Sequence, residues 1–505
     1  MDTFARDNLP PREQWPVLRE MDYPPSLNAA VELLRGPWAD RPCVLGPDET
    51  WSYAELRARA EGIARVLVEE HGLEPGNRVL LHGFNDPQLV ACWFGILLAG
   101  GVVVATMPML RAGELSNVIA KAQVSHALAD ARLAGEVQGV RELRTLDELP
   151  GTGTFEPVAT ASDDVALIAF TSGTTGEPKG CVHFHRDVLT ICDTFAREIL
   201  SPSPDDVFTG TAPLAFTFGL GVLVLFPMRF GASFAPIPKP GLEPLVETVR
   251  RHGVTRLATA PTMYRALLRE GVELETLKAC ISAGEPLPAS VARAWHEHTG
   301  IRIVDGIGST EMLHIFIASR AEDSKFGSVG TPVPGYEAMV VGPDMQPVPV
   351  GEVGRLAVRG PTGCRYLADP RQTEYVVDGW NLTGDSFRVD EDGYFWFEAR
   401  NDDLIVSSGY NISPFEVETA LLEHDAVAEV AVVAAPDEAR GHVVKAFVVL
   451  PDGVAGDSEL VETLQTHVKE RIAPYKYPRR IEFIEALPRT PTGKVQRSAL
   501  RGRGA

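Results

Sequence analysis

Short apolar runs rich in β-branched residues alternate with helical patterns along the first 330 residues, and this alternation restricts the possible architectures. Several of these runs end in turns that contain glycine or acidic residues. They cover residues 78–82, 101–105, 165–170, 279–283 and 301–304. A strand, a turn and a helix in succession form right-handed βαβ units, which build parallel sheets. We therefore expect an α/β fold whose ligands bind at the carboxyl ends of the strands.

The pattern changes after residue 330. Strand-like runs separated by Gly- and Pro-containing turns occupy residues 330–335, 351–360 and 393–397, and they predict a small β-rich subdomain. Beyond residue 401, helical and strand patterns alternate again and predict a compact α+β unit. We expect a large N-terminal domain over residues 1–400 and a small C-terminal domain over residues 401–505.

Charge is distributed unevenly along the 505 residues. The chain has 47 Lys and Arg against 68 Asp and Glu, a formal net charge of −21. This acidic excess argues against binding to nucleic acid or to an anionic membrane. Residues 469–505 differ, because they hold ten basic and three acidic residues. This basic tail (residues 469–505) is either a solvated surface or an element that faces phosphates.

Cysteine usage and hydropathy indicate the compartment. The six cysteines are scattered without a C-x-x-C pair, which favours buried thiols in a reducing, cytoplasmic location. Two uncharged runs, 87–110 and 207–228, are interrupted by glycine and proline. They predict a buried helix and a buried strand rather than membrane spans.

The strongest local signal is the segment Thr171-Ser-Gly-Thr-Thr-Gly-Glu-Pro-Lys-Gly180, which follows a hydrophobic strand. Gly173 and Gly176 allow backbone amides to approach an anion closely, and Lys179 supplies positive charge. The segment is not a Walker A loop, because G-x-x-x-x-G-K-[ST] is absent. A plain Gly/Ser/Thr loop is the alternative, and the order of the ten residues disfavours it.

This segment resembles the phosphate loop of the adenylate-forming superfamily, which contains acyl- and aryl-CoA ligases, peptide-synthetase adenylation domains and luciferases. Four later segments extend the resemblance in the right order. Residues 306–311 look like the adenylate motif and 382–385 like the ribose motif. Residues 399–403 look like the hinge, with Asp402 at its centre, and 491–494 like the C-terminal catalytic loop. The resemblance covers nearly the whole chain and implies ATP, Mg²⁺ and coenzyme A as ligands.

The resemblance also implies roles for individual residues. Lys494, Thr310 and Glu311 would be catalytic, with Glu311 bound to Mg²⁺ through the carboxylate that this ion prefers. Lys494 would stabilise the charge that builds up between the acid and the α-phosphate. A surface lysine is the alternative for Lys494, and a turn-capping carboxylate is the alternative for Asp385. The implied ATP and AMP contacts are Thr171, Ser172, Gly173, Thr174, Thr175, Lys179, Gly284, Glu285, Pro286, Asp305, Gly306, Ile307, Thr310, Asp385 and Arg400. Many relatives carry an aromatic residue where Ile307 stands.

An acyl pocket is expected beside the adenylate motif. Its aromatic walls and several glycines suit a flat ring better than a long flexible chain. Phe216 and Phe218 could instead belong to the core, and His314 could be a pocket group or a core histidine. Many aryl ligases carry a histidine where Phe216 stands. The expected pocket residues are Ala212, Phe216, Phe218, Gly219, Tyr264, Ser282, Ala283, Gly308 and His314.

The substrate class rests on closer resemblance. Residues 308–316 are similar to benzoate-type CoA ligases, and residues 4–10, 360–367 and 405–412 look closer still to the 2-aminobenzoate-CoA ligase branch. We therefore expect an ATP-dependent aryl-CoA ligase whose small-molecule substrate is 2-aminobenzoate, followed by salicylate and benzoate. A stand-alone adenylation enzyme that loads a carrier protein is the main alternative, although the sequence ends at Ala505 with no carrier domain. A luciferase-like oxygenase and a non-enzymatic scaffold fit the motifs less well, and a homodimer is left open.

The second half-reaction would use another face of the small domain. The resemblance implies that this domain rotates about Asp402 and that a tunnel for the CoA thiol is then lined by Ser407, Ser408, Gly409 and Tyr410. Val406 departs from the lysine that benzoate ligases generally carry there. On this view the basic tail is a face carried to ATP and to the CoA phosphates by the rotation. His183 and His185 could form a metal pair, but no third ligand cluster is present and structural roles are favoured.

Overall fold

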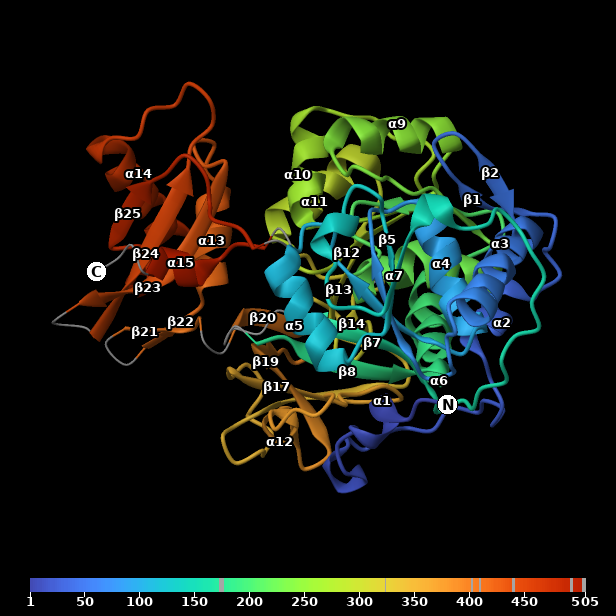
Figure 1. The fold of residues 1–505 in the computed structure, drawn as a ribbon. Coiled ribbons are helices and arrows are strands. Elements are labelled where there is room, and N and C mark those ends of the chain that lie inside the picture. The colour runs from blue at the N-terminus through green and yellow to red at the C-terminus, as the bar shows by residue number, and fades with distance from the viewer. Residues whose placement is uncertain are drawn as a thin grey trace.

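The computed structural model describes residues 1–171, 177–322, 324–400, 403–407, 410–437, 441–490 and 494–501. Figure 1 shows a large N-terminal body and a smaller C-terminal body beside it, coloured orange to red. The large body contains two mainly parallel sheets with helices between and outside them, and a third, antiparallel sheet beneath. The α/β fold expected from the sequence is confirmed.

The first large sheet carries the segment that precedes the glycine-rich loop. Its strand order is β6-β5-β3-β4-β7-β8, parallel throughout except for the final β7–β8 hairpin. The hairpin therefore lies at an edge of the sheet. The strands are β3 (Arg78–His82), β4 (Val102–Thr106), β5 (His126–Ala129), β6 (Glu142–Thr145), β7 (Val165–Thr171) and β8 (Lys179–Phe184).

The second large sheet has the order β15-β14-β13-β12-β11-β9-β10-β1-β2. Its centre is parallel, and antiparallel pairs close both edges. The strands are β1 (Pro42–Leu45), β2 (Thr50–Ser52), β9 (Val207–Gly210), β10 (Ser233–Phe234), β11 (Arg256–Thr259), β12 (Ala279–Ser282), β13 (Ile303–Gly308), β14 (Ile315–Ala318) and β15 (Thr331–Pro332).

Side chains that alternate along the strands divide the large body into layers. Leu81 faces the helices between the two sheets, whereas Leu80 faces a separate outer cluster that contains α5. On the second sheet Ile281 faces inward and Cys280 faces the cluster of α9, α10 and α11. This alternation follows from the two-residue period of a strand, and both faces of each sheet are covered, as parallel sheets require.

Helices fill the space between and outside the sheets. Helix α4 is almost wholly apolar, and nearly all of its residues are buried because it lies between the two sheets. The helices of the large body are α1 (Phe4–Asp7), α2 (Ala29–Leu34), α3 (Tyr53–Arg65), α4 (Pro87–Leu98), α5 (Ala112–Ala122), α6 (His185–Ile191), α7 (Thr217–Leu220), α8 (Phe226–Phe230), α9 (Leu242–His252), α10 (Pro261–Arg269), α11 (Ala289–Thr299) and α12 (Gln372–Tyr375).

The β-rich subdomain predicted after residue 330 is present as an antiparallel sheet. Strands β16, β17, β19 and β18 pair in this order, and β20 pairs with β19. Its last strand leads towards the small body. The strands are β16 (Glu337–Val341), β17 (Gly354–Arg359), β18 (Val376–Val377), β19 (Trp380–Val389) and β20 (Phe395–Arg400).

The small C-terminal body has its own core. Helices α13 and α14 pack on one face of a three-stranded sheet, and α15 closes the other face through Leu500. A two-stranded hairpin, β21–β22, adjoins it. The elements are β21 (Ile405–Ser407), β22 (Tyr410–Ile412), α13 (Pro414–Leu422), β23 (Glu429–Asp437), β24 (Gly441–Val449), α14 (Ser458–Arg471), β25 (Arg480–Phe483) and α15 (Arg497–Arg501).

The remaining expectations about burial are confirmed. The run 87–110 contains α4 and β4, and the run 207–228 contains β9 and short helices, most of them buried. Within the described part of the chain, no helix has both the length and the apolar surface that crossing a bilayer would need. All six cysteines are buried free thiols.

Candidate active site

The β7–β8 hairpin sets the position of the glycine-rich loop. Thr171 ends β7, Lys179 begins β8, and the two residues are register partners across the hairpin. Residues 172–176, which include Ser172, Gly173, Thr174 and Thr175, lie outside the described residues. The Thr171 hydroxyl is buried and has no hydrogen-bond partner among the described residues. Since buried polar groups are normally paired, this hydroxyl is suited to an oxygen-rich ligand at the base of the loop.

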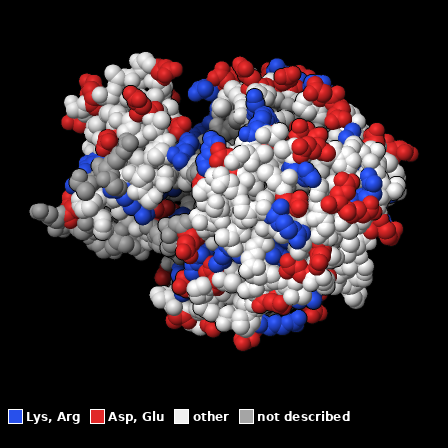
Figure 2. Space-filling model, viewed as in Figure 1, with Lys and Arg blue, Asp and Glu red and all other residues white. Residues whose placement is uncertain are grey.

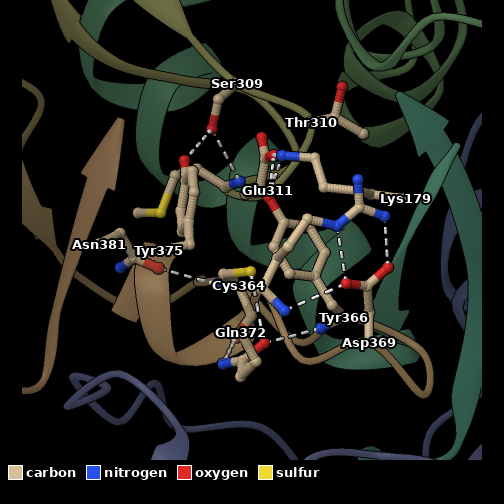
Figure 3. A network of polar contacts seen from close by, with 12 residues as sticks. Lys179, Ser309, Thr310, Glu311, Cys364, Tyr366, Asp369, Gln372, Tyr375 and Asn381 are labelled. Carbon is tan, nitrogen blue, oxygen red and sulfur yellow. Dashed lines mark hydrogen bonds and ion pairs between the residues drawn. The ribbon is translucent and has the colours of Figure 1, made fainter. Parts of the chain in front are cut away.

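Lys179 extends from the hairpin into a compact polar network (Figure 3). Its Nζ donates a hydrogen bond to the Tyr366 hydroxyl at 2.8 Å and lies 3.6 Å from Glu311 Oε1. The Tyr366 hydroxyl in turn donates to Glu311 Oε1 at 2.5 Å. Burial, together with the nearby Glu311 charge, raises the pKa of Tyr366 far above its usual value. The phenol therefore keeps its proton and acts as the donor to Glu311.

The adenylate motif is held from behind by a buried histidine. His183 Nε2 lies 2.8 Å from the Thr310 carbonyl oxygen, so this nitrogen carries the proton and donates it. Burial lowers the pKa of His183 to about 4, which keeps the ring neutral at physiological pH. The next turn contains Leu313 at φ 67°, a strained conformation for a branched side chain. The His183 contact thus fixes a tight turn that directly follows Ser309 and Thr310.

His183 and His185 each make a separate structural contact. His185 Nδ1 accepts a hydrogen bond from the Ala29 amide at 3.1 Å, while His183 is engaged with Thr310. Burial lowers the pKa of His185 to about 4 as well. No group of three or more His, Cys, Asp or Glu able to hold a metal occurs among the described residues. The structural roles favoured from the sequence agree with these contacts.

The ribose motif is organised by strand register. Asp385 on β19 lies opposite Arg400 on β20, and Arg400 Nη1 donates to Asp385 Oδ1 at 2.8 Å. Burial raises the pKa of Asp385, and Arg400 opposes this shift. Gly384 has φ 78°, which allows the chain to turn beside the guanidinium. The side chains of Thr383 and Arg400 both hydrogen-bond to the Asp385 carboxyl, so Asp385 is held in a buried strand pair and is not a cap of an exposed turn.

The resemblance implies that the adenine is framed by Gly284, Glu285, Pro286, Asp305, Gly306 and Ile307, and part of this predicted adenine frame is open. Gly284 has φ 89°, and no atom would lie within 4 Å of a Cβ there. Asp305 is buried, and its Oδ1 has no partner among the described residues. Burial raises the pKa of Asp305 to about 8. Glu285, Pro286 and Ile307 are half-buried beside it. The frame therefore presents both an apolar side and a carboxyl group that keeps its proton at neutral pH.

The small body carries Lys494 to the same cleft. A short antiparallel contact between Arg489 and Val495 holds the base of its loop, and the Lys494 amide donates to Thr490 Oγ1 at 3.2 Å. The Lys494 side chain stays exposed, but the surrounding cleft walls lower its pKa, as does Arg400. Glu285, Asp385 and Glu311 act in the opposite direction. Lys494 thus lies within electrostatic range of Glu285, Asp385 and Glu311, which belong to the segments predicted to bind adenine, ribose and Mg²⁺.

Basic side chains gather along the groove between the two bodies (Figure 2). Around Glu285 they include Arg265, Arg489, Lys494 and Arg497, all of which oppose the burial-induced rise in the pKa of this carboxyl. Most of the basic tail, however, is neutralised inside the small body. Its ion pairs are Arg471–Glu423, Lys476–Glu416, Arg480–Asp437, Arg489–Glu429, Arg497–Glu418 and Arg501–Asp403. The basic face carried to ATP by rotation stays a prediction, and these pairs with acids from residues 403–437 reduce the net charge that such a face would carry.

The acyl region is built on the segment between β9 and α7. Asn85 clamps this segment by donating to the Ala212 carbonyl and accepting from the Leu214 amide, both at 2.9 Å. Phe216 and Phe218 follow and are half-buried rather than wholly in the core. A Cβ at Gly219 would overlap the Pro213 carbonyl, so only glycine fits this turn. Asn85 was not identified from the sequence, which gave no motif around it.

His314 forms an aromatic wall of this region. The ring is 2% exposed and lies 4.7 Å from Phe226, 5.3 Å from Phe195 and 5.9 Å from Phe218, centroid to centroid. Neither ring nitrogen makes a well-formed hydrogen bond among the described residues, and the Phe218 backbone is the polar group that acts on the ring. Burial lowers the pKa of His314 to about 3, so the imidazole is neutral. Beyond the Phe218 backbone, the ring therefore keeps hydrogen-bonding capacity for a ligand.

The other predicted pocket residues differ in their surroundings. Ser282 ends β12 and Ala283 follows it, both buried, and exposed Gly308 packs against the His314 carbonyl. Tyr264 lies instead in the cluster of α10 and α11, 4.8 Å from Trp295. Its hydroxyl donates to the carbonyls of two neighbouring strands. The structure places Tyr264 in the core rather than on an open wall, because its only polar atom is already engaged.

The predicted thiol tunnel is only partly described. Ser407 is buried in β21 and pairs with Tyr410 in the register of the β21–β22 hairpin. Asp402, Ser408 and Gly409 lie outside the described residues, as do residues 491–493 of the catalytic loop. In Figure 1 this hairpin lies at the lower edge of the small body, whereas α15 faces the large body. The hinge and the tunnel remain predictions.

The protein residues fit a divalent cation only together with a substrate. Glu311 supplies one buried carboxylate, and the described residues contain no further carboxylate cluster around it. Mg²⁺ usually takes one or two carboxylates plus phosphate oxygens and water. The donor set at Glu311 therefore suits Mg²⁺ bound together with ATP rather than a resident metal centre.

Comparisons with known proteins agree with this geometry. The sequence model described as AMP-binding enzyme matches residues 35–366, and the model described as AMP-binding enzyme C-terminal domain matches residues 416–494. The benzoate–CoA ligase of Thauera aromatica is 37% identical over 481 residues, covering 90% of both chains. The crystal structure of the anthranilate CoA ligase AuaEII with anthranoyl-AMP superimposes with a TM-score of 0.90 at 31% identity, covering 96% of this chain and 98% of that one. A benzoate CoA ligase from Burkholderia xenovorans LB400 gives a TM-score of 0.87 at 32% identity, covering 94% and 100%.

Proposed function

This chain belongs to the AMP-binding enzymes, and on that premise we propose that it is an ATP-dependent aryl-acid–CoA ligase that acts on an ortho-substituted benzoate. The acid is activated as an aryl adenylate with release of pyrophosphate. The thiol of coenzyme A then displaces AMP to form the aryl-CoA thioester. We propose 2-aminobenzoate as the preferred acid, followed by salicylate and benzoate. The similarity to benzoate–CoA and anthranilate CoA ligases supports this substrate class.

The first half-reaction joins two anions, the carboxylate and the α-phosphate, and the cleft supplies the positive charge that this requires. Lys179 and the loop after Thr171 would hold the terminal phosphates, and Asp385 with Arg400 would orient the ribose. Mg²⁺, held by Glu311 together with phosphate oxygens, would neutralise part of the phosphate charge when bound. Lys494 would stabilise the charge that develops between the two reacting groups. The proximity of Lys494 to Glu285, Asp385 and Glu311 supports an adenylation role for this arrangement.

The second half-reaction would follow rotation of the small body about Asp402. The segment from Ser407 to Tyr410 would then replace Lys494 at the site and line the path of the thiol. The separate core of the small body supports this step, because the unit can move without breaking the core of the large one.

His314 is the observation that carries the substrate preference. The imidazole is neutral and 2% exposed, and beyond the Phe218 backbone no group among the described residues pairs with its nitrogens, so burial of the ring is costly unless a ligand also pairs with it. An amino or hydroxyl group ortho to the carboxylate can exchange one hydrogen bond with this ring, whereas benzoate cannot. The surrounding rings of Phe195, Phe218 and Phe226 suit the flat face of the substrate.

A panel of acids tests both parts of the proposal. Pyrophosphate release and thioester formation are measured with ATP, Mg²⁺ and each of 2-aminobenzoate, salicylate, benzoate and 2-methylbenzoate, with and without coenzyme A. The methyl analogue matches the ortho group in size but cannot form the hydrogen bond. We expect kcat/KM for 2-aminobenzoate to exceed that for 2-methylbenzoate by about tenfold or more, and His314→Ala to abolish this ratio.

Each contrary outcome points to a different error. Pyrophosphate release without thioester would favour loading of a carrier protein. If none of the acids in the panel causes pyrophosphate release, the proposal of a ligase is refuted. Equal kcat/KM for the amino and methyl acids in the wild-type enzyme would refute the role of His314 while leaving the reaction class intact.

A further inference from the structure

We propose that the hydroxyl of Tyr366 is a spacer that prevents Lys179 and Glu311 from collapsing into a direct ion pair, and so keeps the carboxylate available to a divalent cation. Tyr366 is a positioning residue in this role, because it acts through Lys179 and Glu311. The inference rests on the proposed function, since it concerns the cation that accompanies ATP.

The geometry places one hydroxyl between two opposite charges (Figure 3). It accepts a hydrogen bond from Lys179 Nζ at 2.8 Å and donates one to Glu311 Oε1 at 2.5 Å. Nζ and Oε1 are 3.6 Å apart, longer than the usual length of about 2.8 Å for a charge-assisted N–H···O bond. The charges therefore attract each other but do not share a direct hydrogen bond.

The Tyr366 hydroxyl cannot move aside, because the backbone of Tyr366 is tied to β8, the strand that carries Lys179. Leu367 donates its amide proton to the Gly180 carbonyl at 2.8 Å, and Tyr366 bridges to Cys181 of β8. The Tyr366 amide donates to the side-chain oxygen of Gln372 at 2.9 Å. The residue is 1% exposed. Tyrosine and lysine are thus held in register by the same strand.

Two rings also limit the path of the lysine. Nζ lies 4.8 Å from the centroid of the Tyr366 ring and 5.8 Å from that of Tyr375. The two rings meet edge to face at 5.7 Å. The ammonium group is therefore stabilised by aromatic faces as well as by the hydroxyl. The Lys179 ammonium group can therefore move from Glu311 to a phosphate without first breaking a direct hydrogen bond to the carboxylate.

Removal of the hydroxyl would reverse this balance. In Tyr366→Phe the ring volume is kept, but Nζ and Oε1 can approach to direct contact. A partly buried carboxylate with a direct lysine partner is a poorer ligand for a cation, because the cation must first displace the lysine. A purely structural hydroxyl would instead lower stability and leave the cation dependence unchanged.

The test measures Mn²⁺ binding, with ATP present, by electron paramagnetic resonance, and ATP binding with and without Mg²⁺ by calorimetry. For Tyr366→Phe we expect the Mn²⁺ dissociation constant to rise about five- to tenfold, while ATP binding without metal changes little. At saturating ATP, Lys179→Met/Tyr366→Phe should bind Mn²⁺ as tightly as Lys179→Met alone, because without the lysine no direct ion pair can form. Tyr53→Phe is the matched control, because its buried hydroxyl donates only to two carbonyls, those of Pro227 and Ala232.

Several results would overturn the proposal. An unchanged Mn²⁺ affinity in folded Tyr366→Phe, or the same shift in Tyr53→Phe, would remove the spacer role. If Tyr366→Phe does not fold, a crystal structure of the wild-type protein without nucleotide decides, because direct contact between Nζ and a Glu311 oxygen would refute the spacer. If the wild-type protein binds ATP with no dependence on Mg²⁺, the proposed function itself fails.

Discussion

Arg365 and Asp187 form an ion pair in which neither side chain has exposed surface, with 2.8 Å between Nη1 and Oδ2. The guanidinium also lies 4.2 Å above the ring of Phe184. Asp187 caps α6 by accepting from the Phe184 amide at 2.9 Å. Replacing Arg365 by methionine keeps much of the side-chain volume but leaves the carboxylate buried without its counter-charge.

Arg365→Met should therefore cause a large loss of folding stability, because the Asp187 carboxylate stays buried without its counter-charge. Breaking one side of a buried ion pair costs about 3–5 kcal/mol, whereas an exposed pair contributes about 0–1 kcal/mol. Arg359→Met is the matched control, since Arg359 pairs with exposed Glu337 at 2.6 Å and also lies over a ring, 4.3 Å from Trp380. The double variant Arg365→Met/Asp187→Asn removes both charges and keeps an oxygen for the Phe184 amide. It should recover part of the loss.

Urea unfolding followed by tryptophan fluorescence measures the difference. We expect Arg365→Met to lower the free energy of unfolding by about 3–5 kcal/mol, and Arg359→Met by no more than about 1 kcal/mol. Equal losses in the two variants would refute the reasoning, as would a double variant that is less stable than Arg365→Met. Because Arg365 sits next to Tyr366 and near His183, the variant should also loosen Thr310, measurable as faster amide exchange in residues 309–313.

Three further outcomes follow from the site. Lys494→Ala should slow adenylate formation by about a hundredfold or more but leave thioester formation from preformed adenylate nearly intact; equal losses in both half-reactions would contradict its role. The folded-state pKa of Asp305 is raised to about 8, so between about pH 4 and pH 8 the folded protein keeps a proton that the unfolded chain releases. The contribution of Asp305 to the free energy of unfolding therefore falls by about 1.4 kcal/mol per pH unit as the pH rises through this range. Urea unfolding of Asp305→Asn should lack this slope, and a pH profile identical to that of the wild-type protein would contradict the prediction. Gly221 has an ordinary helical backbone, so Gly221→Ala adds no backbone strain, but the new Cβ would lie 2.5 Å from His314 Nε2. The ring must shift, so KM for the aryl acid should rise about tenfold while ATP binding is unchanged. Equal shifts for the acid and for ATP would contradict a local effect.

The parts of the fold predicted from the sequence are those determined by local pattern. Short apolar runs rich in β-branched residues, ending in turns with glycine or acidic residues, identified β3, β4, β7 and β12, and the motifs predicted that Lys179, Glu311 and Asp385 belong to one site. These features depend on neighbours in the chain. The connection between Arg365 and Asp187 spans 178 residues, and nothing in the periodicity of either segment indicates it.

Tyr366 shows the same limit in the site. The segment 360–367 resembled one branch of the family, but the resemblance gave no role to its tyrosine. The role depends on the bridge to Cys181, which brings the segment alongside β8 and places the hydroxyl between Lys179 and Glu311. Such a contact requires knowledge of which strands become neighbours. His183 was likewise recognised as structural, whereas its contact with the Thr310 carbonyl emerged only from the fold.

The basic tail shows why a charge count along the chain is a poor guide to the charge that a ligand meets. Six of its nine described basic residues pair with acids from the first part of the same small body. Lys494 forms no ion pair with a described residue and remains exposed at the cleft. Pairing leaves Lys469, Arg479 and Lys494 without an ion pair to a described residue, and of these three Lys494 lies within electrostatic range of Glu285, Asp385 and Glu311. In the proposed mechanism, rotation of the small body would bring this one charge to the site and withdraw it again.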